Sequence, residues 1–168
     1  MTAILGLDVG ERRVGVAIAE AGDPSAMPLT TLQRHRSIDA DAADLLALIE
    51  RHGATELVVG LPFEAAGGEG PQAALTRAWV EAIVAALGAS APPVSFQDER
   101  LSSHLAETRL GPMRRGRSGG PPTKTQRDAY RSRVDREAAA IILQDALDTR
   151  RDAQASMTRP QTSMETPA

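Results

Sequence analysis

Three acidic residues lie where the surrounding sequence predicts that strands end or a helix begins. Asp8 closes an apolar run, Glu99 closes a second strand pattern, and Asp135 lies at the head of a long helical pattern. Carboxylate oxygens are the ligands that Mg²⁺ prefers, and a pair of such ions can activate a water and stabilise a leaving oxygen. The three residues therefore predict a metal-binding cluster suited to the hydrolysis of phosphodiester bonds.

The sequence around Asp8 predicts two strands joined by a tight glycine turn. Residues 3–10 are apolar except for this one acid, and residues 12–19 form a second, mostly apolar run. An ionised Asp is costly to bury, so it must become neutral, pair with a cation or bind a metal. A salt bridge from Asp8 to Arg12 or Arg13 is the structural alternative to a metal site.

The periodicity after Asp135 places this residue on the buried face of its helix, at the upstream edge. The positions three, four, seven, eight and eleven residues further on are all apolar: Ala138, Ala139, Ile142, Leu143 and Ala146. The small alanines permit close approach to the sheet, which brings Asp135 towards Asp8 and Glu99. The alternative is an internal salt bridge from Asp135 to Arg131 or to another arginine.

Length and composition predict one ordinary domain. The chain has 168 residues, of which 42% are hydrophobic, enough for a single sizeable core. We place the domain at residues 1–150. Residues 151–168, which lack periodicity, are predicted to form a disordered tail.

The sequence also points to a cellular compartment. The absence of cysteine excludes a disulfide framework and a thiolate metal site. The N-terminus enters the first strand without a signal-like segment, and no apolar run is long enough to cross a bilayer. We therefore expect a soluble, cytoplasmic protein with no membrane partner.

Charge is distributed unevenly along the chain. The net charge is −3, yet residues 109–136, here called the basic segment, contain nine basic and two acidic side chains. Clustered Arg and Lys favour the binding of a polyanion, because phosphates release counterions on contact. A solvated loop whose arginines serve solubility is the alternative.

The sequence contains only four aromatic residues, which argues against base stacking as the main mode of contact with a nucleic acid. Backbone contact through basic side chains is the more natural mode. The candidate nucleic-acid-binding residues are Arg12, Arg100, Arg114, Arg115, Arg117, Lys124 and Arg131.

Strand and helix patterns follow one another in the order of a layered α/β domain. After the first hairpin we predict a strand over 27–34, a helix that begins at 37 or 39 and ends at Gly53, and a buried, parallel strand over 56–62. A helix over 72–87 and a strand over 93–99 follow. The last predicted elements are a short helix with Ser102 as N-cap, an irregular loop over 111–122 and a final helix over 125–150.

Four of these segments resemble the YqgF family, the proposed pre-16S rRNA nucleases that are also described as Holliday junction resolvase-like proteins. The resemblance covers about Ile4 to Leu147, with its motifs in order. They are residues 5–10 with 13–17, residues 58–62 with the glycine-rich loop 67–70, residues 98–103, and residues 134–135 with 138–144.

This resemblance implies a ribonuclease-H-like fold, with a five-stranded mixed sheet that is flanked by helices and whose first three strands are antiparallel. It implies that Asp8, Glu99 and Asp135 match the family's catalytic acids, with Mg²⁺ or Mn²⁺ as the metal. The implied task is maturation of the 5′ end of 16S rRNA. Pre-rRNA is then the favoured partner, with branched DNA and ribosomal particles as further candidates.

Three other functions stay open. Resolution of Holliday junctions in branched DNA is the first, and a non-catalytic ribosome- or RNA-binding module is the second. The Asp-x-Gly turn after the first strand is also similar to the phosphate-binding turn of actin-like kinases and ATPases. Those proteins usually have two lobes, whereas this chain has length for one, and Glu11 replaces the hydroxyl residue that often follows the glycine.

Overall fold

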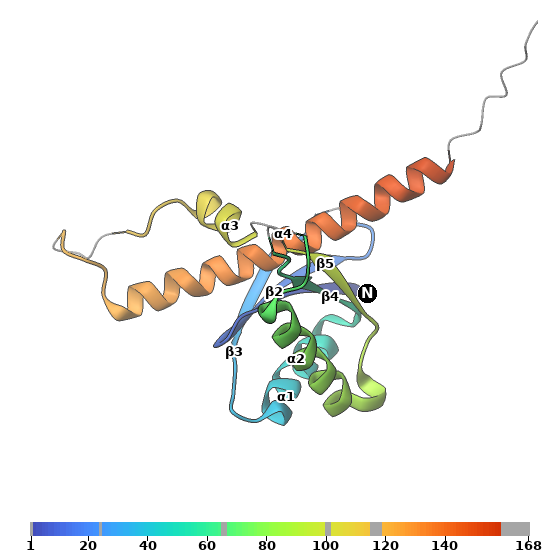
Figure 1. The fold of residues 1–168 in the computed structure, drawn as a ribbon, viewed down its shortest axis with the longest axis horizontal. Coiled ribbons are helices and arrows are strands. Elements are labelled where there is room, and N and C mark those ends of the chain that lie inside the picture. The colour runs from blue at the N-terminus through green and yellow to red at the C-terminus, as the bar shows by residue number, and fades with distance from the viewer. Residues whose placement is uncertain (1, 24, 65–66, 100–101, 115–118, 159–168) are drawn as a thin grey trace, which may run out of the picture.

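The computed structural model describes residues 2–158 apart from positions 24, 65–66, 100–101 and 115–118. Helices cover both faces of one sheet (Figure 1). In chain order the elements are β1 (Ala3–Val9), β2 (Arg13–Glu20), β3 (Met27–Gln33), α1 (Ile38–His52), β4 (Ala54–Leu61), α2 (Pro71–Leu87), the 3₁₀ turn η1 (Gly88–Ser90), β5 (Val94–Asp98), α3 (Ser102–Leu110) and α4 (Lys124–Thr158).

The five strands form one mixed sheet in the order β3-β2-β1-β4-β5. The pairs β1–β2 and β2–β3 are antiparallel, whereas β1–β4 and β4–β5 are parallel. The predicted mixed sheet, with its first three strands antiparallel and a parallel β4, is therefore confirmed. Because β1, β4 and β5 run in the same direction, their C-terminal ends meet at one edge of the sheet.

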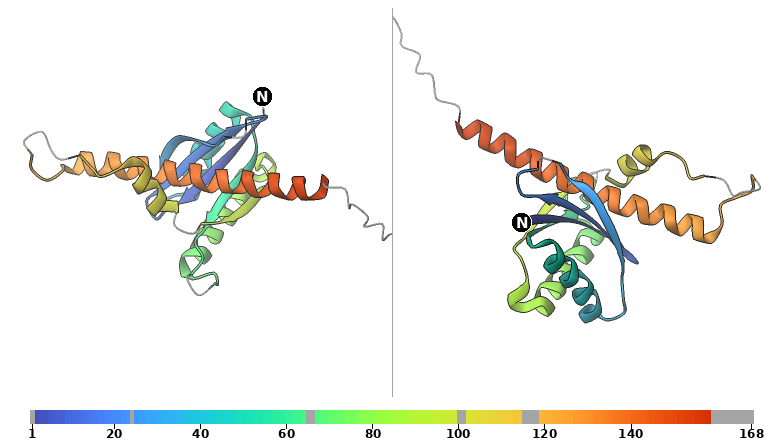
Figure 2. Two further views of the ribbon diagram at one scale, coloured as in Figure 1. Left: turned by 90° about the horizontal axis from the view of Figure 1, so that it is seen from above. Right: turned by 180° about the vertical axis from the view of Figure 1, so that it is seen from behind.

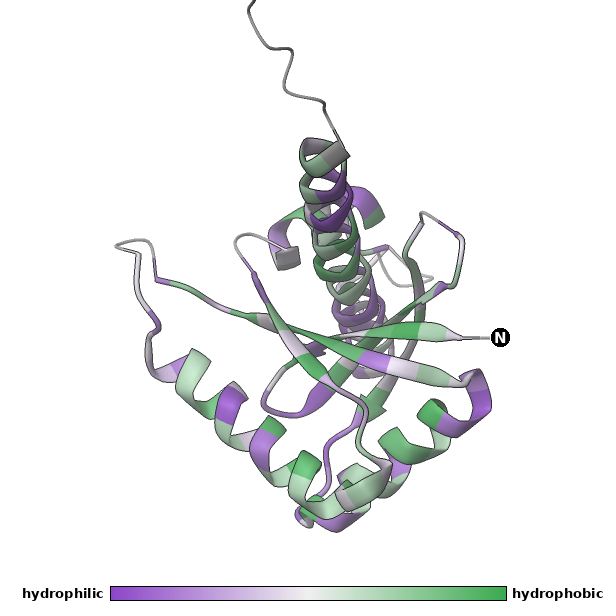
Figure 3. Cartoon of the chain, turned by 90° about the vertical axis from the view of Figure 1, so that its right-hand side faces the viewer, coloured by the Kyte–Doolittle hydropathy of each residue, from purple (hydrophilic) through white to green (hydrophobic). Residues whose placement is uncertain are grey.

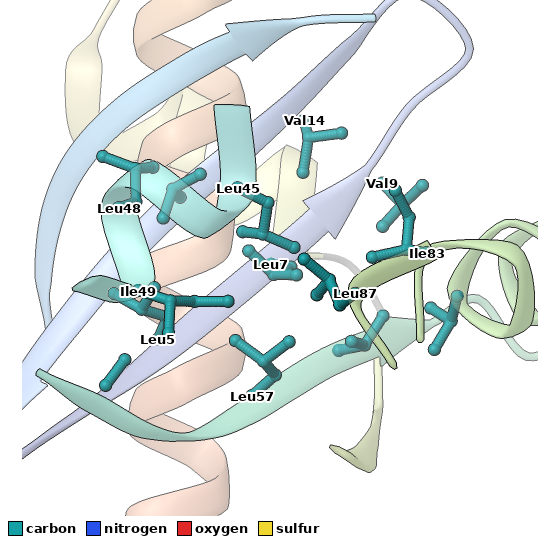
Figure 4. Close-up of a cluster of buried hydrophobic side chains, with 14 of the residues drawn as sticks. Leu5, Leu7, Val9, Val14, Leu45, Leu48, Ile49, Leu57, Ile83 and Leu87 are labelled. Carbon is teal, nitrogen blue, oxygen red and sulfur yellow. The ribbon is translucent and has the colours of Figure 1, made fainter. Parts of the chain in front are cut away.

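Alternation along β1 divides its side chains between two layers. Leu5, Leu7 and Val9 belong to the cluster that packs against α1 and α2, as Figure 4 shows. The intervening residues, Gly6 and Asp8, point to the opposite face by the two-residue period of a strand. Asp8 is thereby placed on the face of the sheet that α4 covers.

The layer formed by α1 and α2 closes the larger core. Leu45 and Ile49 of α1 and Ile83 and Leu87 of α2 are buried against the sheet, one helical turn apart on each helix. Helix α1 ends at Gly53, whose left-handed backbone (φ 59°) caps the last turn as the sequence predicts. Figure 3, which views α4 nearly end-on, shows the sheet between α4 and this layer.

Helix α4 lies unusually close to the other face of the sheet. Its residues Ala139 and Leu143 pack in a second buried cluster with Ala17 and Val58. Directly below the helix, a Cβ at Gly6 would lie 2.7 Å from the Cβ of Leu143. The absence of a side chain at this position of the sheet is what allows the close approach.

The final helix is longer than the sequence predicts. We expected it to span residues 125–150 and placed residues 151–168 in a disordered tail, but α4 continues to Thr158. The physical reason is the absence of any helix-breaking glycine or proline between 151 and 158, where alanine, glutamine and methionine favour a helix. Residues 159–168 lie outside the described part of the chain.

Helix α4 extends past the sheet at both ends, and α3 lies beside its N-terminal half (Figure 2). Ala106 of α3 packs there in a small buried cluster with Val134, Ala138 and Ile141 of α4. Between α3 and α4 the described residues form neither helix nor strand, which agrees with the loop predicted over 111–122.

One expectation about apolar segments was wrong. Within the described residues, the segment Pro71–Ser90 is long and apolar enough to cross a membrane by length and composition, with a mean hydropathy of 1.2. Arg77 and Glu81 interrupt the apolar run of this segment, so it does not stand out in the sequence as a membrane span. In this fold it forms α2, whose face containing Trp79, Val80 and Ile83 packs against the sheet.

Candidate active site

The C-terminal edge of the parallel strands brings two of the predicted acids together. Asp8 lies near the end of β1, and Glu99 follows β5 directly, with its backbone N–H donating to the carbonyl of Leu61 on β4 (2.9 Å). A Cβ at Gly60 would lie 2.8 Å from Oε2 of Glu99. Glu99 therefore lies over β4, where glycine leaves space, and reaches Asp8 on the next strand.

The carboxyl groups of Asp8 and Glu99 lie close enough for each to influence the pKa of the other. Two carboxyl groups this close can hydrogen-bond only if one of them holds a proton. The pKa of Asp8 is raised well above its ordinary value, first by burial and then by the negative charges of Glu99 and Asp135. Asp8 is therefore the acid of this pair whose charged form the site disfavours more strongly.

Glu99 has a second hydrogen-bond partner. Burial raises the pKa of its carboxyl group, and hydrogen bonds from Ser102 and Asp8 oppose that rise. The Ser102 hydroxyl donates to Oε1 of Glu99 (2.8 Å) and is buried at the start of α3. We predicted Ser102 as an N-cap; its hydroxyl instead orients Glu99.

The third acid comes from α4 and has a cationic partner. Nε of Arg13 donates to Oδ2 of Asp135 (2.5 Å), and the two side chains are 19% and 24% exposed. Of the alternatives considered from the sequence, the salt bridge of Asp135 to an arginine is present, with Arg13 as the partner. Asp135 is also near enough to Asp8 to raise its pKa.

Close packing of α4 on β2 sets the position of Asp135. Gly15 pairs with Asp8 across the β1–β2 ladder. Any Cβ at Gly15 would overlap the backbone carbonyl of Asp135. This glycine lets the Asp135 backbone rest on the sheet, directly beside the strand position that holds Asp8.

A cleft of about 520 Å³ opens beside Arg13 and Asp135 and is lined by charged side chains. Arginines 12, 13 and 131 line it together with Asp135, Asp128, Gly10 and Glu11. Of the candidate nucleic-acid-binding residues, Arg12 and Arg131 thus lie in the wall of the cleft.

Of the other candidate nucleic-acid-binding residues, the two that the structure describes, Arg114 and Lys124, do not line this cleft. Arg114 lines a separate pocket of about 350 Å³ between the end of α3 and the start of α4. Lys124 is exposed at the first residue of α4. Arg100, Arg115 and Arg117 lie outside the described residues.

Sequence reasoning missed Arg13 as a site residue and considered it only as a partner of Asp8. Its place at the first position of β2, five residues after Asp8, was visible in the sequence. Its pairing with Asp135, 122 positions further on, depends on the approach of α4 to the sheet.

The donor set suits a hard divalent cation, because it consists of three carboxylates that are partly buried on one side of the sheet. In the part of the chain that the structure describes, however, no group of three or more acidic, histidine or cysteine side chains is arranged to hold a metal ion. Asp8 and Glu99 lie close to each other, while Asp135 faces Arg13. A metal site would need Asp135 to turn from Arg13 towards the other two acids.

Comparison with known proteins identifies the fold. The structure resembles that of Thermus thermophilus RuvC in complex with a Holliday junction substrate, with a TM-score of 0.53 and 16% identity over 90% of this chain and 97% of RuvC. A second Thermus thermophilus RuvC structure matches with a TM-score of 0.50. The ribonuclease-H-like fold predicted from the sequence is therefore confirmed.

Relatives at higher identity cover nearly the whole domain. A Chloroflexus aggregans protein named "Putative pre-16S rRNA nuclease" is 43% identical over 149 residues, which are 89% of this chain and 95% of that protein. An Anaeromyxobacter protein of the same name is 41% identical over 146 residues, 87% and 96% of the two chains. A family model described as "RuvX: Holliday junction resolvase" matches residues 2–149. With these matches, the chain belongs to the RuvX family, the YqgF type of Holliday junction resolvase.

Proposed function

We propose that this protein is a metal-dependent nuclease that hydrolyses phosphodiester bonds and processes the 5′ end of pre-16S rRNA. The observation that carries the proposal is the convergence of Asp8, Glu99 and Asp135 from three elements, beside a cleft lined by arginines. The family and the names of its members support the reaction class and a nucleic acid as the partner. The choice of pre-rRNA rests on the names of the relatives.

The three carboxylates would hold a divalent metal, Mg²⁺ or Mn²⁺, which supplies activation of a water and stabilisation of the leaving oxygen. Ser102 keeps Glu99 in place through its hydroxyl group. Arg12 and Arg131, in the wall of the cleft, would bind the phosphates of the strand. Because rRNA is processed where ribosomes assemble, this function also supports a cytoplasmic location and contact with ribosomal particles.

Cleavage of a precursor 16S RNA fragment tests the proposal. We would incubate the wild type and the Asp8→Asn variant with Mg²⁺, Mn²⁺ or EDTA. We expect cleavage only by the wild type and only with metal, while the variant still binds the RNA. Intact RNA under every condition would contradict the nuclease function for this substrate and favour a non-catalytic RNA-binding module.

Holliday junction resolution is a second candidate, because the family model that matches residues 2–149 is described by that activity. A four-way DNA junction, a linear duplex of the same sequence and the RNA fragment should be compared at equal concentration. Preferential, symmetric cleavage of the junction would favour this candidate over rRNA processing.

A further inference from the structure

Arg13 occupies a position between the acids and the cleft. Its guanidinium pairs with Asp135, and both residues contribute to the cleft wall beside Arg12 and Arg131. The backbone of Arg13 is fixed on two sides: its carbonyl accepts from the N–H of Gly10 (2.9 Å), and the residue pairs with Gln33 of β3. The side chain can therefore change partner without movement of the hairpin.

We propose that Arg13 is a positioning residue that exchanges partners during substrate binding. In the metal-free protein it neutralises Asp135; once the acids hold a divalent cation, it turns into the cleft and binds a phosphate of the nucleic acid strand. This inference rests on the proposed function, since it assumes that Asp135 is a metal ligand.

Two observations support the exchange. First, the described acids are not arranged to hold a metal while Asp135 faces Arg13, so a cation and the guanidinium compete for the same carboxylate. Second, Arg12 and Arg131 line the adjoining cleft beside Glu11 and Asp128. Guanidinium groups match phosphate oxygens in a two-pronged geometry. The released side chain thus has an anionic partner within the same cleft.

Metal affinity provides the first test. The melting temperature of the protein would be measured during titration with Mn²⁺, without nucleic acid, for the wild type and for Arg13→Gln. In the variant, no guanidinium at position 13 competes with the cation for Asp135. We therefore expect the half-maximal rise in melting temperature at a Mn²⁺ concentration roughly tenfold lower than in the wild type. Arg12→Gln is the matched control: it removes the same charge from an exposed side chain of the same cleft.

Phosphate binding provides the second test. The salt dependence of binding to a single-stranded RNA oligonucleotide would be measured in EDTA and in Ca²⁺, a larger ion used here to limit cleavage. In the wild type, the slope of the logarithm of the binding constant against the logarithm of the salt concentration should be steeper by about 0.7 in Ca²⁺ than in EDTA, which is the contribution of one extra phosphate contact. Arg13→Gln should show no such gain. Arg13→Lys keeps the charge and should therefore show a wild-type Mn²⁺ midpoint with part of the gain in slope.

The outcomes separate this inference from the proposed function. If Mn²⁺ does not stabilise the wild type, or stabilises Asp8→Asn equally, the proposal that the three acids bind a metal is wrong. If Mn²⁺ stabilises the wild type but Arg13→Gln has the same midpoint as Arg12→Gln, only the exchange of partners is wrong. A weaker Mn²⁺ response of Arg13→Gln would also overturn the exchange and give Arg13 a purely supporting role.

Discussion

At the scale of single residues, the acids of the site are neutralised in two different ways. The pKa of Asp8 is raised by burial and by its acidic neighbours, which favours uptake of a proton, whereas Asp135 is paired with Arg13. A proton and a guanidinium thus each relieve part of the repulsion among the three carboxylates. A divalent cation would replace both, and binding should therefore depend on pH.

The raised pKa of Asp8 leads to a prediction about stability. A group whose pKa is raised by folding stabilises the folded state fully only below its unfolded pKa, and this contribution is lost as the pH rises through the folded pKa. We expect Asp8→Asn, in EDTA, to melt above the wild type at pH 8, by on the order of 3 °C. The difference should shrink as the pH falls towards 3.8, the ordinary value for Asp.

Melting curves of both proteins over this pH range would check the prediction. Glu11→Gln, which removes an exposed negative charge from the neighbouring turn, is the control and should show no comparable gain. A variant of Asp8 that melts well below the wild type at every pH would instead assign the residue a structural role.

Residue types made the acids predictable, but not their partners. Asp8 and Asp135 stood out because an acid in an apolar pattern is rare. The choice of Arg13 over Arg131 as the partner of Asp135 could not be read from sequence spacing, because it depends on which strand α4 touches. That contact is a property of the assembled layers.

At the scale of elements, the closeness of α4 to β2 is the feature on which the site depends. Gly15→Ala would place a methyl group against the carbonyl of Asp135, so the helix must shift. We expect a loss of about 1–3 kcal/mol in the free energy of unfolding, as for other overpacked sites. Chemical denaturation would measure it.

Ala17→Gly is the control for this substitution, since it changes the same face of β2 by one methyl group in the opposite direction. Any decrease in the free energy of unfolding of Ala17→Gly should come from lost packing, and its stabilisation by Mn²⁺ should be the same as in the wild type. If Gly15→Ala keeps both wild-type stability and wild-type Mn²⁺ affinity, the close contact does not set the position of Asp135.

The bounds of the elements show which parts of the fold can be predicted from hydrophobic periodicity. The strands and helices around the core were predictable because burial imposes periods of two or 3.6 residues on them. The last turns of α4 lie outside the core, and residues 151–157 are all exposed, so burial imposes no such period on them. Their helix follows from local propensity, which a search for periodicity does not detect.

At the scale of the whole molecule, the chain combines an acidic remainder with the basic segment of residues 109–136. Replacing Arg114, Lys124 and Arg131 together with alanine should weaken RNA binding and lower the slope of its salt dependence by about 2. Fluorescence anisotropy at several salt concentrations would measure this slope. An unchanged slope would count against nucleic acid docking by the basic segment.

Arg51→Ala serves as the control for charge alone. Arg51 lies in a pocket with Thr2 and Ala3, at the opposite end of β1 from Asp8. Loss of its charge should leave the slope of the salt dependence close to that of the wild type, because no phosphate is expected to bind there.

The projection of α4 beyond the sheet sets a minimum length for the substrate. Asp135 lies eleven positions after Lys124 in the same helix, a span of roughly 17 Å. In B-form DNA, successive phosphates of one strand advance by about 3.4 Å along the helix axis. A duplex arm that is cut beside Asp135 and contacts Lys124 along this helix must therefore continue for about five base pairs, and shorter arms should be cut poorly whatever their sequence.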